Sequence, residues 1–267
     1  MLPKCLALKA RLRAGETTLG AWLTFSDAAV AEIMADLGYD WLLIDAEHAP
    51  FSLDSLAHLL TAFHGRQAVP LIRVRWNDPP LIKQVLDLGA GGILIPYVCT
   101  PDEAWRAVAA CKYPPEGIRG FGPRRAADYG RQMAAYIQQA NDAILVGIQI
   151  EHISGVKAIR DILAVPGLDF LMLGPMDLSA SLGLLGQLEH PKVVEAMEMV
   201  INEANRRRLP VGMPLPADTS LDTVTRWVEK GCRFVLAGLD QSFLTQAAQD
   251  NLAQLRQRLH ATTPSQV

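Results

Sequence analysis

Residues 69–98 read VPLIRVRWNDPPLIKQVLDLGAGGILIPYV, and this stretch has the pattern of one strand–helix–strand unit. Its two short apolar runs, Val69–Val74 and Gly92–Val98, are typical of buried parallel strands. Between them, Asn77-Asp78-Pro79 supplies an N-cap followed by proline, and four apolar residues then recur at helical spacing, Leu81, Ile82, Val85 and Leu86. The stretch therefore predicts a helix that connects two parallel strands.

The same alternation continues along the whole chain. Further apolar runs are Leu19–Phe25, Trp41–Asp45, Ile144–Ile150, Leu168–Leu173, Pro210–Leu215 and Phe234–Leu239. Amphipathic helices are predicted at Lys192–Arg207 and at Leu221–Val228, before Gly231. Eight strand–helix units predict a single α/β domain over residues 1–267, a (β/α)₈ or TIM barrel. An open doubly wound sheet is the alternative, but no GxGxxG motif opens the first helix.

Composition excludes several classes of partner. The chain has 267 residues, half of them hydrophobic, and a formal net charge of -3. Without a basic run, it is not expected to bind nucleic acid or an anionic membrane surface. Its four cysteines are scattered and form no CxxC pair, which favours a reduced, cytoplasmic protein. No segment approaches the ~20 apolar residues that span a bilayer.

Ionisable side chains follow four of the predicted strands. In a barrel of this kind, chemistry takes place at the C-terminal ends of the strands. The second strand ends in Asp45-Ala-Glu-His48, the third in Arg73, the fifth in Gln149-Ile-Glu151, and the sixth runs into Gly174-Pro-Met-Asp177. The sequence therefore predicts one active-site rim built from these strand ends.

Glu151 and Asp177 are the candidate metal ligands. Two carboxylates on neighbouring strands offer hard oxygens that suit Mg²⁺ or Mn²⁺ and leave positions open for substrate and water. The alternative is that each carboxylate caps the helix that follows it. Gly174-Pro175-Met176 can present free backbone N–H groups to a substrate anion, although a tight strand–helix connection without a ligand uses the same residues.

His48 is a candidate general base, with Asp45 three residues earlier to orient it. The alternative is a structural histidine in a loop, as we expect for His152. Arg73 ends an otherwise apolar strand, so it needs an anionic partner. That partner is either a substrate oxyanion or a structural carboxylate, Asp45 or Glu47.

These residues also carry a family resemblance. The ordered segments that carry it are WLLIDAEHAP (41–50), RVRWND (73–78), IKQ (82–84) with Asp87, GGILIP (91–96), YPPEGIRG (113–120), QIE (149–151) and GPMDLS (174–179). The resemblance covers most of the chain, from about Gly20 to Asp240. The chain resembles the HpcH/HpaI family of divalent-metal pyruvate aldolases, enzymes that cleave 4-hydroxy-2-oxo acids to pyruvate and an aldehyde, or run the reverse aldol addition.

The resemblance implies roles for the pyruvate half of the site. Glu151 and Asp177 would hold Mg²⁺, Mn²⁺ or Co²⁺, and pyruvate would chelate the cation through its carboxylate and keto oxygens. The amides of Met176 and Asp177, in the turn that begins at Gly174-Pro175, would bind the pyruvate carboxylate, with Gln149 nearby.

The resemblance also implies the chemical roles. Arg73 would stabilise the enolate oxygen of pyruvate. His48, paired with Asp45, would take the proton from the C4 hydroxyl of the 4-hydroxy-2-oxo acid during cleavage. The cation and Arg73 would together replace the Schiff-base lysine of other aldolases.

Members of the family are typically homohexamers, trimers of dimers that exchange the last helix. The resemblance therefore implies that residues 241–267 pack on a neighbouring subunit and that Asp87 reaches a neighbour's site. Cys111–Gly130 is expected to be an active-site loop. Within it, Pro123-Arg124-Arg125 departs from the heptanedioate aldolases, and Arg124 would either bind an acidic aldehyde or hold the loop on another subunit.

Two other functions fit the same residues. One keeps the metal site but decarboxylates oxaloacetate or acts as a lyase on a CoA thioester. For the CoA enzyme, only Arg119, Arg124 and Arg125 could offer a basic surface to phosphates. The other is a binding barrel without catalysis, which the presence of Glu151, Asp177, Arg73 and His48 disfavours.

Overall fold

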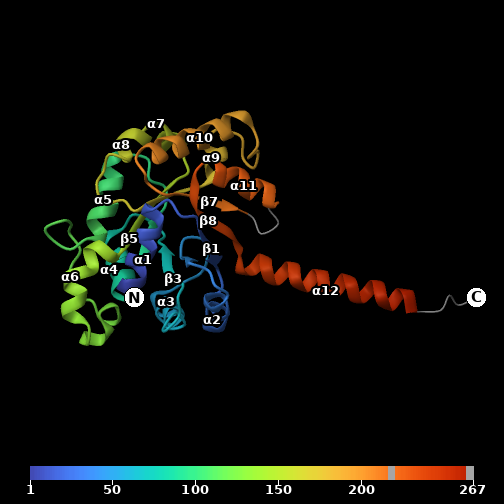
Figure 1. Ribbon diagram of the computed structural model, residues 1–267, viewed down its shortest axis with the longest axis horizontal. Coiled ribbons are helices and arrows are strands. Elements are labelled where there is room, and N and C mark those ends of the chain that lie inside the picture. The colour runs from blue at the N-terminus through green and yellow to red at the C-terminus, as the bar shows by residue number, and fades with distance from the viewer. Residues whose placement is uncertain (216–219, 263–267) are drawn as a thin grey trace, which may run out of the picture.

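The computed structural model describes residues 1–215 and 220–262. Eight parallel strands close into a barrel in sequence order, with helices around the outside (Figure 1). This confirms the predicted (β/α)₈ fold. The strands are β1 (Thr18–Leu23), β2 (Trp41–Asp45), β3 (Val69–Arg73), β4 (Gly92–Ile95), β5 (Leu145–Ile150), β6 (Phe170–Leu173), β7 (Val211–Leu215) and β8 (Cys232–Leu239).

Each strand is followed by one or two helices, and those that follow β1 to β7 return the chain to the N-terminal end of the barrel. They are α2 (Ala28–Asp36), α3 (Leu53–Thr61), α4 (Pro79–Asp87), α5 (Pro101–Cys111), α7 (Ile153–Lys157) with α8 (Ile159–Ile162), α9 (Pro175–Ser181) with α10 (Pro191–Arg206), α11 (Leu221–Glu229) and α12 (Asp240–Thr262). Three further elements are α1 (Leu2–Arg13), the 3₁₀ helix η1 (Arg125–Gly130) and α6 (Met133–Ala143).

The unit at residues 69–98 folds as its pattern predicts. Strands β3 and β4 pair in parallel, with Arg73 opposite Leu94, and α4 crosses between them. Its apolar stripe faces the barrel, because Ile82, Val85 and Leu86 are buried. Asp78 is the N-cap, although its side chain makes no capping hydrogen bond, and Pro79 occupies the first turn, where no N–H donor is needed.

Three aromatic rings fill the N-terminal half of the barrel. Trp41 stacks on Phe234 with ring centroids 3.8 Å apart, and Phe170 stacks on Phe234 at 4.6 Å. Facing glycines make the room, since a Cβ at Gly20 would lie 2.3 Å from the Trp41 ring and one at Gly147 would lie 2.1 Å from the Phe170 ring. This layer is a solid floor, so the site above it can open only at the C-terminal rim.

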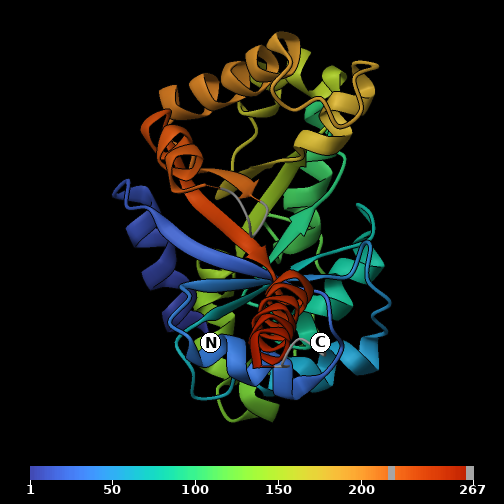
Figure 2. The same cartoon turned by 90° about the vertical axis from the view of Figure 1, so that its right-hand side faces the viewer.

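Helix α12 extends away from the barrel (Figures 1 and 2), and several of its apolar side chains are exposed. Leu244, Leu252 and Leu255 are each at least 48% exposed. The exchange of this helix between subunits stays a prediction, and residues 263–267 lie outside the described residues. In the described part of the chain, none of the helices combines the length and hydropathy required to cross a membrane.

Candidate active site

A pocket of about 690 Å³ opens at the C-terminal rim of the barrel. It collects predicted site residues from four strand ends. These are Asp45 and His48 after β2, Arg73 at the end of β3, Gln149 on β5, and Gly174, Pro175, Met176 and Asp177 after β6. Most of the residues predicted from the strand ends therefore line one cavity, although Glu151 is not among its lining residues.

The guanidinium of Arg73 is held in the pocket by contacts on several sides. It lies opposite Asp45 in the β2–β3 register, and its Nε and Nη2 donate to the two Asp45 carboxylate oxygens at 2.9 and 2.8 Å. Glu47 lies 3.2 Å from Nε, and the guanidinium stacks 4.2 Å above the Trp22 ring. The structural salt bridge considered from the sequence is thus present, and the same side chain lines the pocket.

Glu151 is buried and held from both sides. Its Oε1 accepts from the Tyr97 amide at 2.7 Å, and its Oε2 accepts from Gln149 Nε2 at 2.7 Å. Tyr97 takes a positive φ of 56° to present that amide. Burial, together with the nearby Glu47 and Asp177 carboxylates, raises the pKa of Glu151 to about 7. A cation at this position would relieve both effects.

Asp177 is exposed in the pocket and does not cap a helix. It lies in the first turn of α9, whose N-cap is Gly174 with no side-chain capping bond. The backbone at Gly174 lies very close to the Glu151 side chain, because a Cβ at Gly174 would lie 2.4 Å from Glu151 Cβ and 2.6 Å from its Oε2. Glycine at this position therefore lets β6 bring Asp177 beside Glu151.

The donor set fits a hard divalent cation with few protein ligands. Glu151 and Asp177 offer two carboxylates, and the neighbouring Glu47 Oε2 is buried without a hydrogen-bond partner. Within residues 1–215 and 220–262, no cluster of three or more His, Cys, Asp or Glu side chains could hold a metal. A cation held by Glu151 and Asp177 would thus keep coordination positions open for substrate and water.

His48 is placed differently from the prediction. Asp45 Oδ1 accepts from the backbone amides of Glu47 and His48 at 3.2 and 3.3 Å, so Asp45 orients the loop. The imidazole is 67% exposed, and its Nε2 lies 3.8 Å from Glu47 Oε2. His152 is structural, as expected, because its Nδ1 accepts from Ser154 N and caps α7.

Asp87 and Arg124 lie at the other end of the barrel within one chain. Helix α4 runs back from the rim, so its last residue, Asp87, reaches the N-terminal end, where its Oδ1 accepts from Arg119 at 2.7 Å. Helix α5 carries residues 112–130 to the same end, where Arg125 donates to the Leu88 carbonyl. The expected loop over the chain's own site is therefore wrong, while contact with a neighbour's site stays a prediction.

Two groups that support the site, the Trp22 ring and the Tyr97 amide, were not predicted from the sequence. Trp22 forms the platform under Arg73, but an aromatic residue within a strand reads as ordinary core. The backbone amide of Tyr97 holds Glu151 in place by a hydrogen bond. Any residue except proline has such an amide, so the residue type does not reveal this contact. The only available signal for Trp22 was its position near the end of β1, where inward side chains reach the rim.

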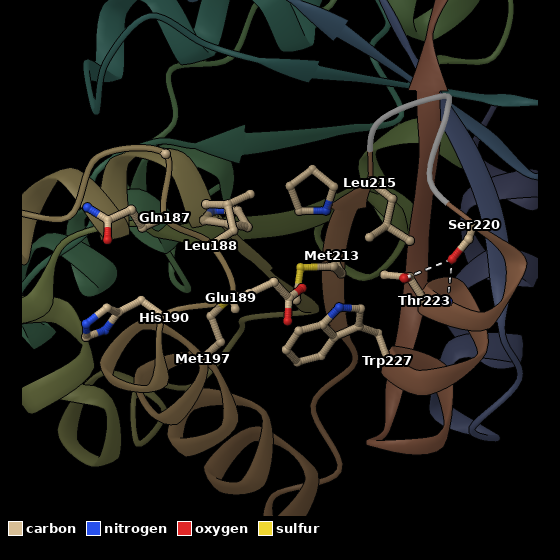
Figure 3. Close-up of a pocket in the computed structure, with 13 residues that line it drawn as sticks. Gln187, Leu188, Glu189, His190, Met197, Met213, Leu215, Ser220, Thr223 and Trp227 are labelled. Atoms are coloured by element: carbon tan, nitrogen blue, oxygen red, sulfur yellow. Dashed lines mark hydrogen bonds between the residues drawn. The ribbon is translucent and has the colours of Figure 1, made fainter.

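A second cavity of about 610 Å³ adjoins the rim between α10 and α11 (Figure 3). Its apolar wall is formed by Met197, Met213 and Trp227, and its edge includes Ser220, which hydrogen-bonds Thr223 as the N-cap of α11. Apart from Pro175, none of the predicted site residues lines this cavity. It therefore adjoins the candidate active site, with which it shares Pro175 and Pro214, but none of that site's ionisable side chains line it.

Comparisons with known proteins agree with this geometry. The model of the family described as HpcH/HpaI aldolase/citrate lyase matches residues 18–247. A 4-hydroxy-2-oxo-heptane-1,7-dioate aldolase of Salmonella dublin is 41% identical over 91% of this chain and 92% of its own. A solved HpcH/HpaI aldolase/citrate lyase family protein from Burkholderia cenocepacia is 36% identical, with a TM-score of 0.89 over 94% of this chain and 99% of the other. The citrate synthase SbnG is 29% identical, with a TM-score of 0.85 over 95% and 98%.

Proposed function

The chain belongs to the HpcH/HpaI aldolase/citrate lyase family and is an aldolase, and from that premise we propose how its site works. We propose that it uses a divalent cation, held by Glu151 and Asp177, to cleave a 4-hydroxy-2-oxo acid to pyruvate and an aldehyde, or to join the two. The observation that supports this most directly is that the carboxylate of buried Glu151 lies near that of Asp177, which lines the same pocket as Arg73.

The first turn of α9 is suited to bind the pyruvate carboxylate. Pro175 has no N–H, and the first α9 amide with an acceptor among the described hydrogen bonds is that of Leu178, which donates to Gly174 O. The amides of Met176 and Asp177 thus have no described partner and remain available to an anion. Gln149 lies on the same side and already donates to Glu151.

Arg73 is suited to stabilise charge on the substrate's C2 oxygen. Its guanidinium is held rigidly by Asp45, Glu47 and Trp22, so it needs no reorganisation when that charge develops. When bound, a divalent cation supplies Lewis-acid polarisation to the same oxygen. The exposed imidazole of His48 faces the opening, where it can accept the proton of the C4 hydroxyl and pass it to water.

Pyruvate release tests this function. Racemic 4-hydroxy-2-oxo acids are incubated with the EDTA-treated protein, and Mg²⁺, Mn²⁺ or Co²⁺ is then restored. We expect release only with metal, and near abolition of the metal-stimulated rate in Glu151→Gln. Glu16→Gln, at an exposed ion pair, is the matched control and should retain the rate. Full activity of Glu151→Gln at saturating Mn²⁺ would contradict the proposed ligand set.

No release with any metal would instead favour the two alternative activities. Oxaloacetate decarboxylation and carbon–carbon bond cleavage in a CoA-thioester substrate would then be assayed with the same variants. Both reactions pass through a carbanion next to a carbonyl, so both would still require Arg73.

We also propose that the protein is a homo-oligomer, a hexamer built as a trimer of dimers, in which α12 packs on a neighbour. The exposed leucines of α12 support this, because one chain alone leaves them uncovered. Light scattering of the full chain and of a chain ending at Leu239 tests it. A monomeric full chain would contradict the proposal.

A further inference from the structure

We propose that the acceptor half of this pocket is built for uncharged aldehydes. This inference rests on the proposed aldolase function and adds the substrate class to it. It concerns the wall of the pocket that lies between the ends of β1 and β8, on the side of Trp22 and Leu239.

This wall is apolar with a few neutral polar groups. Its apolar side chains are Trp22, Phe25, Pro50, Pro214 and Leu239, and its neutral polar side chains are Thr24, Ser26 and Gln241. The same wall continues into a hollow of about 1010 Å³ beside the first turns of α12. An aldehyde with an alkyl or aryl tail therefore has room to extend from the reacting carbons across apolar surface.

The charges around the wall oppose a second carboxylate. Among the described lining residues, Arg73 is the one guanidinium or ammonium group, and Asp45 and Glu47 already pair with it. Asp45 and Asp177 line the pocket itself, and Asp250 lines the adjoining hollow. A carboxylate at the far end of the aldehyde would lose water without gaining a cation.

The wall is also fixed before substrate arrives. Asp240 is buried at the end of β8, and its carboxylate accepts from Thr24 N at 2.8 Å, Thr24 Oγ1 at 2.6 Å and Phe25 N at 2.9 Å. These hydrogen bonds hold the loop after β1 against the N-terminus of α12. The loop therefore cannot easily rearrange to bring a distant cation to the acceptor.

The acceptor class proposed for this chain differs from the one implied by the name of a relative. A heptane-1,7-dioate carries a second carboxylate in the half of the molecule that leaves as the aldehyde. The Salmonella dublin protein is named for such a substrate. The neutral wall of this chain points to a different acceptor class.

Butanal and 4-oxobutanoate form the test pair, because they differ in a terminal methyl against a carboxylate. Aldol addition to pyruvate is measured with each at saturating Mn²⁺. We expect kcat/KM for butanal to exceed that for 4-oxobutanoate by at least about tenfold. Equal values, or a preference for 4-oxobutanoate, would overturn the inference, including the case in which a neighbouring subunit supplies an arginine.

Exchange of the pyruvate methyl protons with D₂O, followed by NMR, keeps the two proposals apart. Exchange needs no aldehyde, so metal-dependent exchange with the wrong acceptor preference overturns only the acceptor class. Absence of exchange with every metal overturns the aldolase function and the inference with it.

Gln241→Arg supplies the missing charge at an exposed position of the wall, and Gln241→Met is the matched neutral variant. The readout is the ratio of kcat/KM for 4-oxobutanoate to that for butanal. We expect Gln241→Arg to raise this ratio about tenfold over Gln241→Met. An unchanged ratio would show that the acceptor tail does not contact this wall.

Discussion

Replacing Gly174 with alanine would place a methyl group between the two side chains that support the proposed metal site. The backbone at Gly174 has φ -119° and ψ 82°, a negative φ open to alanine, so the effect is steric. The new Cβ would lie 2.4 Å from Glu151 Cβ, 2.6 Å from Glu151 Oε2 and 2.9 Å from Gln149 Nε2. One of these neighbours must move.

The size of the effect follows from how firmly Glu151 is held. Both its oxygens are hydrogen-bonded at 2.7 Å and the side chain is buried, so it cannot swing into solvent. Overpacking of this kind costs about 1–3 kcal/mol of stability. Displacing a ligand by part of an ångström lowers metal affinity by about 10–100-fold, as loss of an orienting contact does.

Calorimetric titration of the EDTA-stripped protein with Mn²⁺ measures that affinity directly, and thermal melts measure the stability. Gly122→Ala is the matched control, because its Cβ would meet only Asp87 Oδ2 at 3.7 Å, an ordinary contact. We expect Gly174→Ala to fold, to bind Mn²⁺ at least about tenfold more weakly than Gly122→Ala, and to lose pyruvate release in proportion. Wild-type Mn²⁺ affinity in a folded Gly174→Ala protein would refute the assignment of Glu151 as a ligand.

Three further predictions concern the rim, the floor and the thiols. Arg73→Lys keeps the charge but loses the fork that Asp45 holds, so kcat should fall by about 10²–10³; a lysine variant within threefold of wild type would argue against the role. Phe234→Ala removes the centre of the aromatic floor and should lower the free energy of unfolding by about 3–5 kcal/mol in urea titrations. Burial raises the pKa of three thiols from 9.0 to about 12, those of Cys5, Cys111 and Cys232. Between these values the unfolded thiols lose protons that the folded ones keep, so stability should fall as pH rises above about 9, by roughly 1.4 kcal/mol per pH unit and thiol; a flat urea midpoint from pH 8 to 10.5 would contradict it.

The fold was readable from the sequence because each strand is a short apolar run between breakers. Both faces of a barrel strand are buried, so the runs are continuous and hard to confuse with amphipathic helices. The strand boundaries were less accurate where the site distorts the backbone. A strand was predicted from the apolar run Gly92–Val98, but β4 ends at Ile95. Tyr97 adopts a positive φ, and its amide donates a hydrogen bond to Glu151. That turn depends on a tertiary contact that no local pattern contains.

The site was readable as far as strand ends define it. Parallel strands carry Asp45, Arg73, Gln149 and Glu151 to one rim whatever the loops do, and the structure has them together. The direction of the His48 ring was not readable, because it depends on the loop that Asp45 closes through backbone amides. The position of residues 112–130 was not readable for a related reason. Helix α5 carries the chain to the N-terminal end of the barrel, and the loop pattern alone does not show at which end the loop lies.

The two interpretations of Arg73 turn out to describe one arrangement. A guanidinium has five N–H donors, and Asp45 takes one from Nε and one from Nη2. Gln149 Oε1 takes one from Nη1 at a long 3.4 Å. Two donors are left on a side chain that lines the pocket. Because Gln149 also donates to Glu151, the structural bonds connect the carboxylate proposed to hold the metal to the guanidinium proposed to stabilise the substrate oxygen. The salt bridge therefore orients Arg73 for the substrate and does not compete with it.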